Sequence, residues 1–176
     1  NSLVPRLRFK EFSGEWEEKS LGKLASIVNT KVGHRKVTLF SIDADKGLIS
    51  QLEKFGRIIA GNSTPNYYFI QKGDFAYNKS ATKAYPQGQI SVLETHEEGA
   101  VPNSIFTCFR LKDLILYEYA KYLFMNNTHG KWIADYIEIG ARAHGALAIN
   151  NKTLLELPIP YPTSAIEQQK IADTLS

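Results

Sequence analysis

The spacing of apolar residues along this chain changes once, close to residue 113. Before that point, short runs rich in β-branched and aromatic residues alternate with polar residues, a pattern typical of strands. Turn-forming residues at 43–47 and 72–74 combine acidic side chains with glycine and separate these runs. The strands expected from the pattern are residues 36–42, 57–61, 67–70, 75–77, 90–93 and 105–111.

After that point the apolar residues recur every three or four positions, which predicts an amphipathic helix over 113–126. Gly130 marks a break, and a second helix is expected over 131–138. Three prolines in 158–162 exclude helix there and predict an extended segment. The pattern therefore predicts an α+β domain with a mixed, largely antiparallel β-sheet and a few helices.

Two serines stand where helices are expected to begin. Ser20 is expected to cap a short helical turn that runs to Leu24. Ser164 and Glu167 have the spacing of a capping box, in which each side chain bonds the backbone amide of the other residue. A last helix is therefore expected to start at residue 165.

Length and composition indicate the number of domains and the cellular environment of the chain. The chain has 176 residues, of which 43% are hydrophobic and 22% charged, as in one ordered globular domain. Its single cysteine, Cys108, excludes an internal disulfide and a cysteine-based zinc site. The longest apolar runs are far shorter than a membrane span, and the first residues do not resemble a signal peptide. A cytoplasmic protein without a membrane partner is expected.

The net charge of +3 conceals an uneven distribution. Residues 31–92 carry nine basic and four acidic side chains, whereas residues 93–100 carry three acidic side chains and no basic one. Such asymmetry favours a polyanionic partner for the central stretch. A solvated basic face is the alternative interpretation.

Catalytic patterns are absent from the sequence. It has no glycine-rich phosphate loop, no serine-hydrolase elbow and no zinc-protease motif. Its histidines do not have the spacing of metal ligands, and Cys108 stands inside an apolar run that predicts a buried structural thiol. These observations favour a binding module over an enzyme with an unrecognised site.

Three loops carry groups that can bind nucleic acid. Residues 30–36 concentrate basic side chains around a glycine, residues 77–85 mix ammonium, hydroxyl and amide groups, and residues 140–145 place a guanidinium and an imidazole between glycines. A solvated turn, a polar loop and a hinge with an internal salt bridge are the respective alternatives. The candidate DNA-binding residues are Lys31, His34, Arg35, Lys36, Asn78, Lys79, Ser80, Lys83, Arg142 and His144.

Several blocks of the sequence together resemble one family. They are residues 5–17 followed by 21–24, residues 68–78, and residues 154–162 followed by 166–172. The chain resembles the specificity (S) subunit of type I restriction-modification systems, and the last block is the most specific part of the resemblance.

The resemblance implies a target recognition domain that reads one half of a split sequence in double-stranded DNA. The family's S subunit has no catalytic residues. S-adenosylmethionine, ATP and Mg are expected on partner subunits, namely the methyltransferase (M) subunits and the restriction (R) subunit. Residues 1–163 would form the recognition domain, and residues 164–176 the truncated start of a spacer helix. The family's subunit is about twice as long, so an excised domain or a half-length subunit is expected.

Within that function, lysines and arginines of the first two loops would hold phosphates. Base edges would be read by Asn78, Ser80, Arg142 and His144. The main alternative is a protein-interaction module whose basic loops bind an acidic partner.

Overall fold

The computed structural model describes residues 4–137 and 146–176. A four-stranded antiparallel sheet lies at its centre, in the order β2-β9-β6-β7. These strands are β2 (Ala25–Val28), β9 (Phe106–Leu111), β6 (Phe75–Asn78) and β7 (Gln89–Val92). Three antiparallel pairs surround the sheet, and the expected α+β fold with largely antiparallel strands is confirmed. The pairs are β1 (Glu17–Ser20) with β10 (Pro158–Tyr161), β3 (Phe40–Asp43) with β4 (Gly47–Ser50), and β5 (Tyr68–Gln71) with β8 (Glu98–Val101).

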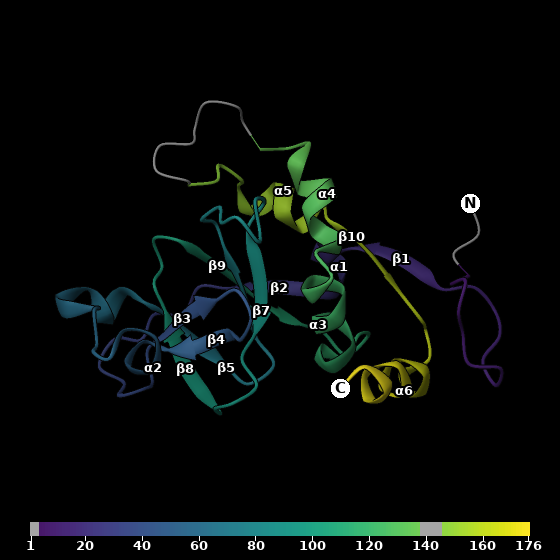
Figure 1. Cartoon of the computed structure of the whole chain (residues 1–176), viewed down its shortest axis with the longest axis horizontal. Helices are drawn as coiled ribbons and strands as arrows, with labels where there is room; N and C mark the ends of the chain where they lie inside the picture. The colour runs from purple at the N-terminus through teal and green to yellow at the C-terminus, as the bar shows by residue number, and fades with distance from the viewer. Residues whose placement is uncertain (1–3, 138–145) are drawn as a thin grey trace.

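The described residues form six α-helices and one 3-10 helix, η1. Their bounds are α1 (Leu21–Leu24), α2 (Gln51–Phe55), η1 (Gly61–Asn66), α3 (Tyr117–Met125), α4 (Thr128–Ala134), α5 (Asn151–Leu155) and α6 (Ala165–Leu175). Figure 1 shows α3 and α4 on one side of the central sheet, and the pairs β3–β4 and β5–β8 on the other side.

The central sheet is buried on both faces. Alternate side chains of β6 point to opposite sides, as the pleat requires. Phe75 stacks on Phe109 with ring centroids 5.3 Å apart, and Phe124 of α3 packs edge-on against both rings. On the other face, Ala76 and Cys108 belong to an apolar cluster that includes Phe40 of β3. Cys108 is 0% exposed, so the predicted buried thiol is confirmed, and burial raises its pKa.

Both predicted helices near residue 120 exist, but their limits differ from the prediction. The helix expected over 113–126 begins only at Tyr117, because the backbone of Leu116 is extended, with φ −79° and ψ 138°. The amide of Leu116, which has no partner within the helix, donates to Gln168 Oε1 at 2.7 Å. The helix expected over 131–138 begins at Thr128 and contains Gly130. An added Cβ at Gly130 would lie 2.5 Å from the Asn127 side chain, which would have to move to make room.

The prediction of a strand over 57–61 is wrong. Residues 57–60 have no regular structure and lead into η1, and Ile58 and Ile59 are about half exposed. Their β-branched side chains therefore do not mark a buried strand. The strand expected over 36–42 is shorter, since β3 starts at Phe40. The short helical turn after Ser20 is confirmed as α1, although the Ser20 side chain makes no capping hydrogen bond.

Only half of the predicted capping box forms at α6. Ser164 Oγ accepts the Glu167 amide at 3.3 Å, and the helix starts at Ala165 as expected. The buried Glu167 carboxylate does not bond back to Ser164. It binds Arg8 through two hydrogen bonds of 2.7 Å and also accepts the Trp16 indole N–H. A charged partner from the N-terminal arm (residues 4–16) replaces the backbone amide and joins this arm to α6.

A buried imidazole links α4 to the loop before β7. His129 is 1% exposed, and its Nε2 lies 2.9 Å from the Gly88 carbonyl oxygen. A carbonyl oxygen only accepts, so Nε2 carries the proton in the neutral ring. Burial lowers the pKa of His129 because desolvation penalises the imidazolium, an effect that the bond to Gly88 opposes.

Substitution of Gly99 should destabilise the domain. An alanine Cβ at this β8 position would lie 2.5 Å from the Phe40 ring, so we expect Gly99→Ala to lower the free energy of unfolding by about 1–3 kcal/mol. Urea denaturation measures this loss, and adding Phe40→Leu should recover part of it. A Gly99→Ala chain as stable as the wild type would show that β8 and β3 do not pack this closely.

Stability should also depend on His129 at mildly acidic pH. The unfolded chain binds a proton at the ordinary histidine pKa of 6.5, and the folded chain binds it only at lower pH. The free energy of unfolding should therefore fall as pH drops below about 6.5. The fall should be shallower in His129→Gln, measured by denaturation at a series of pH values. An equally steep fall in the variant would contradict the assignment.

Candidate nucleic-acid interface

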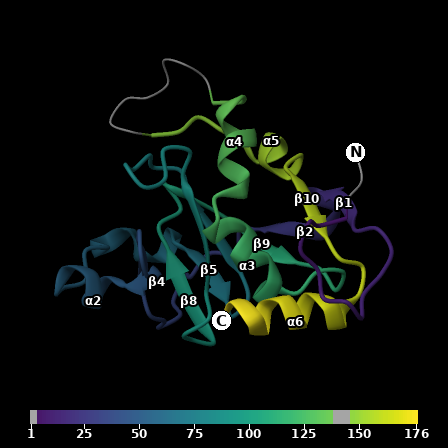
Figure 2. The same cartoon turned by 45° about the vertical axis from the view of Figure 1, so that its right-hand side comes forward.

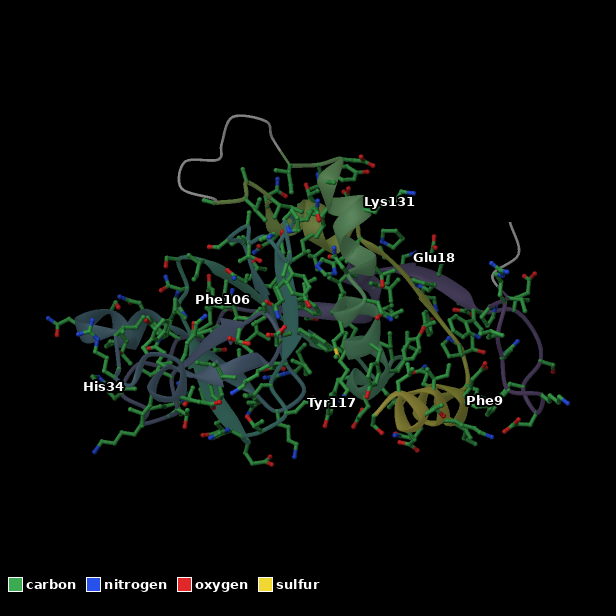
Figure 3. All side chains as sticks on the ribbon, in the orientation of Figure 1. Phe9, Glu18, His34, Phe106, Tyr117 and Lys131 are labelled. Carbon is green, nitrogen blue, oxygen red and sulfur yellow. The ribbon has the colours of Figure 1, made fainter. Side chains whose placement is uncertain are left out.

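The first predicted loop, residues 30–36, is fixed to its neighbours by backbone bonds. Phe69 of β5 donates its amide to Thr30, and the amides of Val32 and Gly33 donate to Tyr67 and to Pro65 of η1. These bonds hold the loop against β5 and η1 while its charged side chains stay at the surface. Lys31, His34, Arg35 and Lys36 are all exposed, and Figure 3 shows His34 at the end of the molecule opposite Phe9.

Aromatic rings orient two cations of the 30–36 loop. Lys31 Nζ lies 4.3 Å from the centre of the Tyr68 ring, and the Arg35 guanidinium lies 4.6 Å from that of Phe69. Arg35 Nη1 also donates to the Lys31 carbonyl at 2.9 Å. Cations held over aromatic faces lose less freedom when they bind a phosphate, and the rings leave their charge intact.

The structure adds a segment that the sequence analysis missed. Residues 57–66 lie against the 30–36 loop, and Tyr67, Ala60 and Val32 pack in one small apolar cluster. This segment exposes Arg57, Ile58 and several small polar side chains of η1. The polar run at 62–66 is a turn signal that could have identified the segment as a surface loop. Its β-branched residues instead suggested a strand.

The second predicted loop, residues 77–85, begins inside β6, and the connection between β6 and β7 is residues 79–88. Asn78 is only 5% exposed, and its Oδ1 accepts the Ser80 amide at 3.1 Å, so this side chain holds the start of the loop. Lys79 and Ser80 are partly exposed, and Lys83 is exposed. The roles predicted for these residues in DNA binding stay predictions, and Asn78 already has a partner inside the loop.

The residues that follow the third predicted loop, from position 146 on, contact the start of the 79–88 loop. Leu147 donates its amide to the Lys79 carbonyl at 2.8 Å, and Ser80 forms a bridge with Ala146. Arg142 and His144 lie outside the described residues. The chain thus places the 79–88 loop and the residues that follow position 145 side by side, whereas the 30–36 loop lies against β5 and η1.

Seven basic side chains of the described chain pair with carboxylates, and the predicted cations of the two loops are not among them, nor are several others such as Arg57 and Lys131. Within the described chain, neither loop's lysines nor Arg35 form an ion pair with a carboxylate. Two acids of the 93–100 stretch are neutralised, because Glu94 pairs with Lys121 at 2.9 Å and Glu97 with Lys72 at 3.4 Å. The positive charge of the two loops is therefore available to a polyanion.

The described part of the chain shows neither a candidate metal centre nor a membrane-spanning helix. Its His, Cys, Asp and Glu side chains do not gather in any group of three that could hold a metal ion. Among residues 4–137 and 146–176, no helix is long and apolar enough to cross a membrane.

The fold is similar to those of solved S subunits. The HsdS subunit from Thermoanaerobacter tengcongensis matches 98% of this chain with a TM-score of 0.54 and 17% identity. The type I restriction-modification S subunit from M. genitalium matches 98% with a TM-score of 0.59 and 16% identity. A chain from a structural study of assembly and conformational transition in the type I R-M system matches 94%, with a TM-score of 0.57 and 14% identity.

The chain spans about two fifths of these structures, since the matches cover 38%, 41% and 38% of their respective lengths. No curated protein matches the chain in sequence. A family model described as the type I restriction modification DNA specificity domain matches residues 13–176, nearly the whole sequence. The chain therefore belongs to the family of type I restriction modification DNA specificity domains.

Proposed function

We propose that this chain reads one half of a split sequence in double-stranded DNA, as the recognition part of the specificity subunit of a type I restriction-modification complex. The observation that carries the proposal is the pair of basic loops whose cations have no carboxylate partner among the described residues. Family membership supports DNA as the polyanion that these loops would bind.

The two loops would divide the work of recognition. Lys31, Arg35 and Lys36 would hold phosphates on one side of the site, and Lys79 and Lys83 on the other. Ser80 is the described side chain best placed to read a base edge, because it stands between these lysines and its hydroxyl can both donate and accept.

The reactions of DNA modification and cleavage would be catalysed by the partner subunits. The methyltransferase (M) subunits would bind S-adenosylmethionine, and the restriction (R) subunit would use ATP and Mg. Under this proposal the chain itself binds none of these cofactors and only directs modification and cleavage to its target.

Binding to duplex DNA should depend steeply on salt. Each lysine that neutralises a phosphate contributes about one unit to the slope of log affinity against log salt. The double variants Lys31→Gln/Lys36→Gln and Lys79→Gln/Lys83→Gln should therefore each lower the slope by about two. Fluorescence anisotropy with a labelled duplex, between about 50 and 200 mM salt, measures these slopes.

Lys10→Gln is the matched control, because Lys10 is an exposed lysine next to Phe9 in the N-terminal arm, and Figure 3 shows Phe9 at the opposite end of the molecule from His34. This variant should leave the slope unchanged. A slope that all three variants lower equally would contradict the proposed site. An acidic protein as partner would be indicated if an acidic polypeptide competed fully with the duplex and no sequence were preferred.

If Arg142 reads a base edge, its substitution should reduce the preference for one DNA sequence over others and should not lower the affinity for all duplexes equally. We expect Arg142→Ala to weaken binding to the preferred site by roughly 1–3 kcal/mol and to leave binding to unrelated duplexes nearly unchanged. Binding of the assembled complex to the preferred and the scrambled site measures the difference. Equal affinity of wild type and variant for both sites would remove Arg142 from the base-reading set.

A further inference from the structure

The 79–88 loop is fixed at its far end by contacts from two separate elements. Gly88 has φ +89°, and an added Cβ there would lie 2.4 Å from the Tyr77 ring and 2.5 Å from the Asn78 carbonyl oxygen. The chain thus passes directly over the end of β6. Tyr77 Oη donates to the Gln87 carbonyl at 2.7 Å, and His129 Nε2 donates to the Gly88 carbonyl at 2.9 Å.

Both donors are buried, so they hold the loop from within the domain. Tyr77 is 0% exposed and belongs to the core between the central sheet and the helices. His129 packs edge-on against Phe124, with ring centroids 5.7 Å apart. Its Nδ1 is buried and has no partner among the described residues. An unpartnered nitrogen is costly, and phenylalanine would fill the same space without that cost.

Hydrogen bonds within the loop extend this restraint from Gly88 back to Thr82. The Gly88 amide donates to the Tyr85 carbonyl at 3.1 Å, as does the Thr82 amide. The Tyr85 amide in turn donates to Thr82 Oγ1 at 3.0 Å. Fixing Gln87 and Gly88 therefore restrains the chain back to Thr82, the residue before Lys83.

We infer that His129 and Tyr77 are positioning residues for DNA recognition, because their hydrogen bonds to consecutive carbonyls fix the 79–88 loop before DNA arrives. The inference rests on the proposed function and adds two residues that touch no DNA. Its energetic basis is preorganisation, since a loop that is already ordered loses less entropy on binding.

The cleanest test removes one hydroxyl. Tyr77→Phe deletes the donor to Gln87 and leaves the ring in place. Tyr119→Phe is the matched control, because Tyr119 is equally buried and donates to Pro160 of β10 at 2.9 Å. Both variants should lose similar stability. Only Tyr77→Phe should weaken duplex binding, by about 3- to 10-fold, as expected for one lost hydrogen bond. Equal binding by the two variants would overturn the inference.

His129 is tested by a pair of substitutions in two backgrounds. His129→Phe should weaken duplex binding, and His129→Gln, which keeps an N–H donor, should restore most of the affinity. The effect of His129→Phe should nearly vanish in the Lys79→Gln/Lys83→Gln background and persist in the Lys31→Gln/Lys36→Gln background. Equal effects in both backgrounds would show a general loss of folding, and would contradict a positioning role.

Amide exchange in the free chain tests the inference without DNA. Tyr77→Phe and His129→Phe should speed exchange at residues 79–88 and leave residues 30–36 unchanged, and Tyr119→Phe should change neither loop. Unchanged exchange at 79–88 would overturn the inference. If exchange changes as expected but the wild type binds no duplex, the proposed function fails and the internal restraint of the loop stands.

Discussion

The constraint on which the rest of the structure depends is the position of β6, which pairs with β9 on one edge and with β7 on the other. All four of its residues are buried. Polar groups fix both of its ends. Asp74, before the strand, is bound bidentately by Arg110 of β9 at 2.7 and 2.8 Å, and Asn78, at its end, holds the Ser80 amide. The loops that leave β6 therefore start from fixed points.

Burial of the sheet on both faces decides where binding can occur. Helices α3 and α4 cover one face, with α6 running below α3 in Figure 2, and the pairs β3–β4 and β5–β8 cover the other (Figure 1), so the face of the sheet itself is not available to a ligand. Ligands can therefore reach only the connecting loops, whose charged side chains differ in whether they are paired. Lys72 and Lys121 neutralise acidic residues of the 93–100 stretch, whereas the cations of the 30–36 and 79–88 loops remain unpaired within the described chain. A small net charge is therefore compatible with two strongly basic surfaces.

Features of the fold could be predicted from the sequence where their signal lies within one helix or strand. Apolar spacing located α3, and Ser164 located the start of α6, because these signals lie within a few residues of each other. The strands β1, β4 and β8 were missed because each has at most one β-branched residue and no aromatic ring, whereas the equally short β5 and β6 carry two aromatic rings each. The strand β2 was missed as well.

Contacts between distant residues could not be predicted in the same way. Glu167 had the spacing of a capping box, but its partner is Arg8, 159 residues away. The basic loops were identified by their residue types alone. The residues that hold these loops in place were not identified, because His129 contacts Gly88 only when α4 is packed against the sheet. Residues 57–66 were missed for the same reason, since only the fold brings them to the 30–36 loop.

The central claim, that this chain specifies half of a split DNA target, is tested most directly by mapping methylated sites in cells with the intact system. The map is made for the wild-type chain, for the Ser80→Ala/Lys83→Ala variant and for cells without the system. The account predicts one split sequence for the wild type, with one half relaxed and the other half unchanged in the variant. Methylated sites that are identical for wild type and variant, or that do not depend on the system, would contradict it.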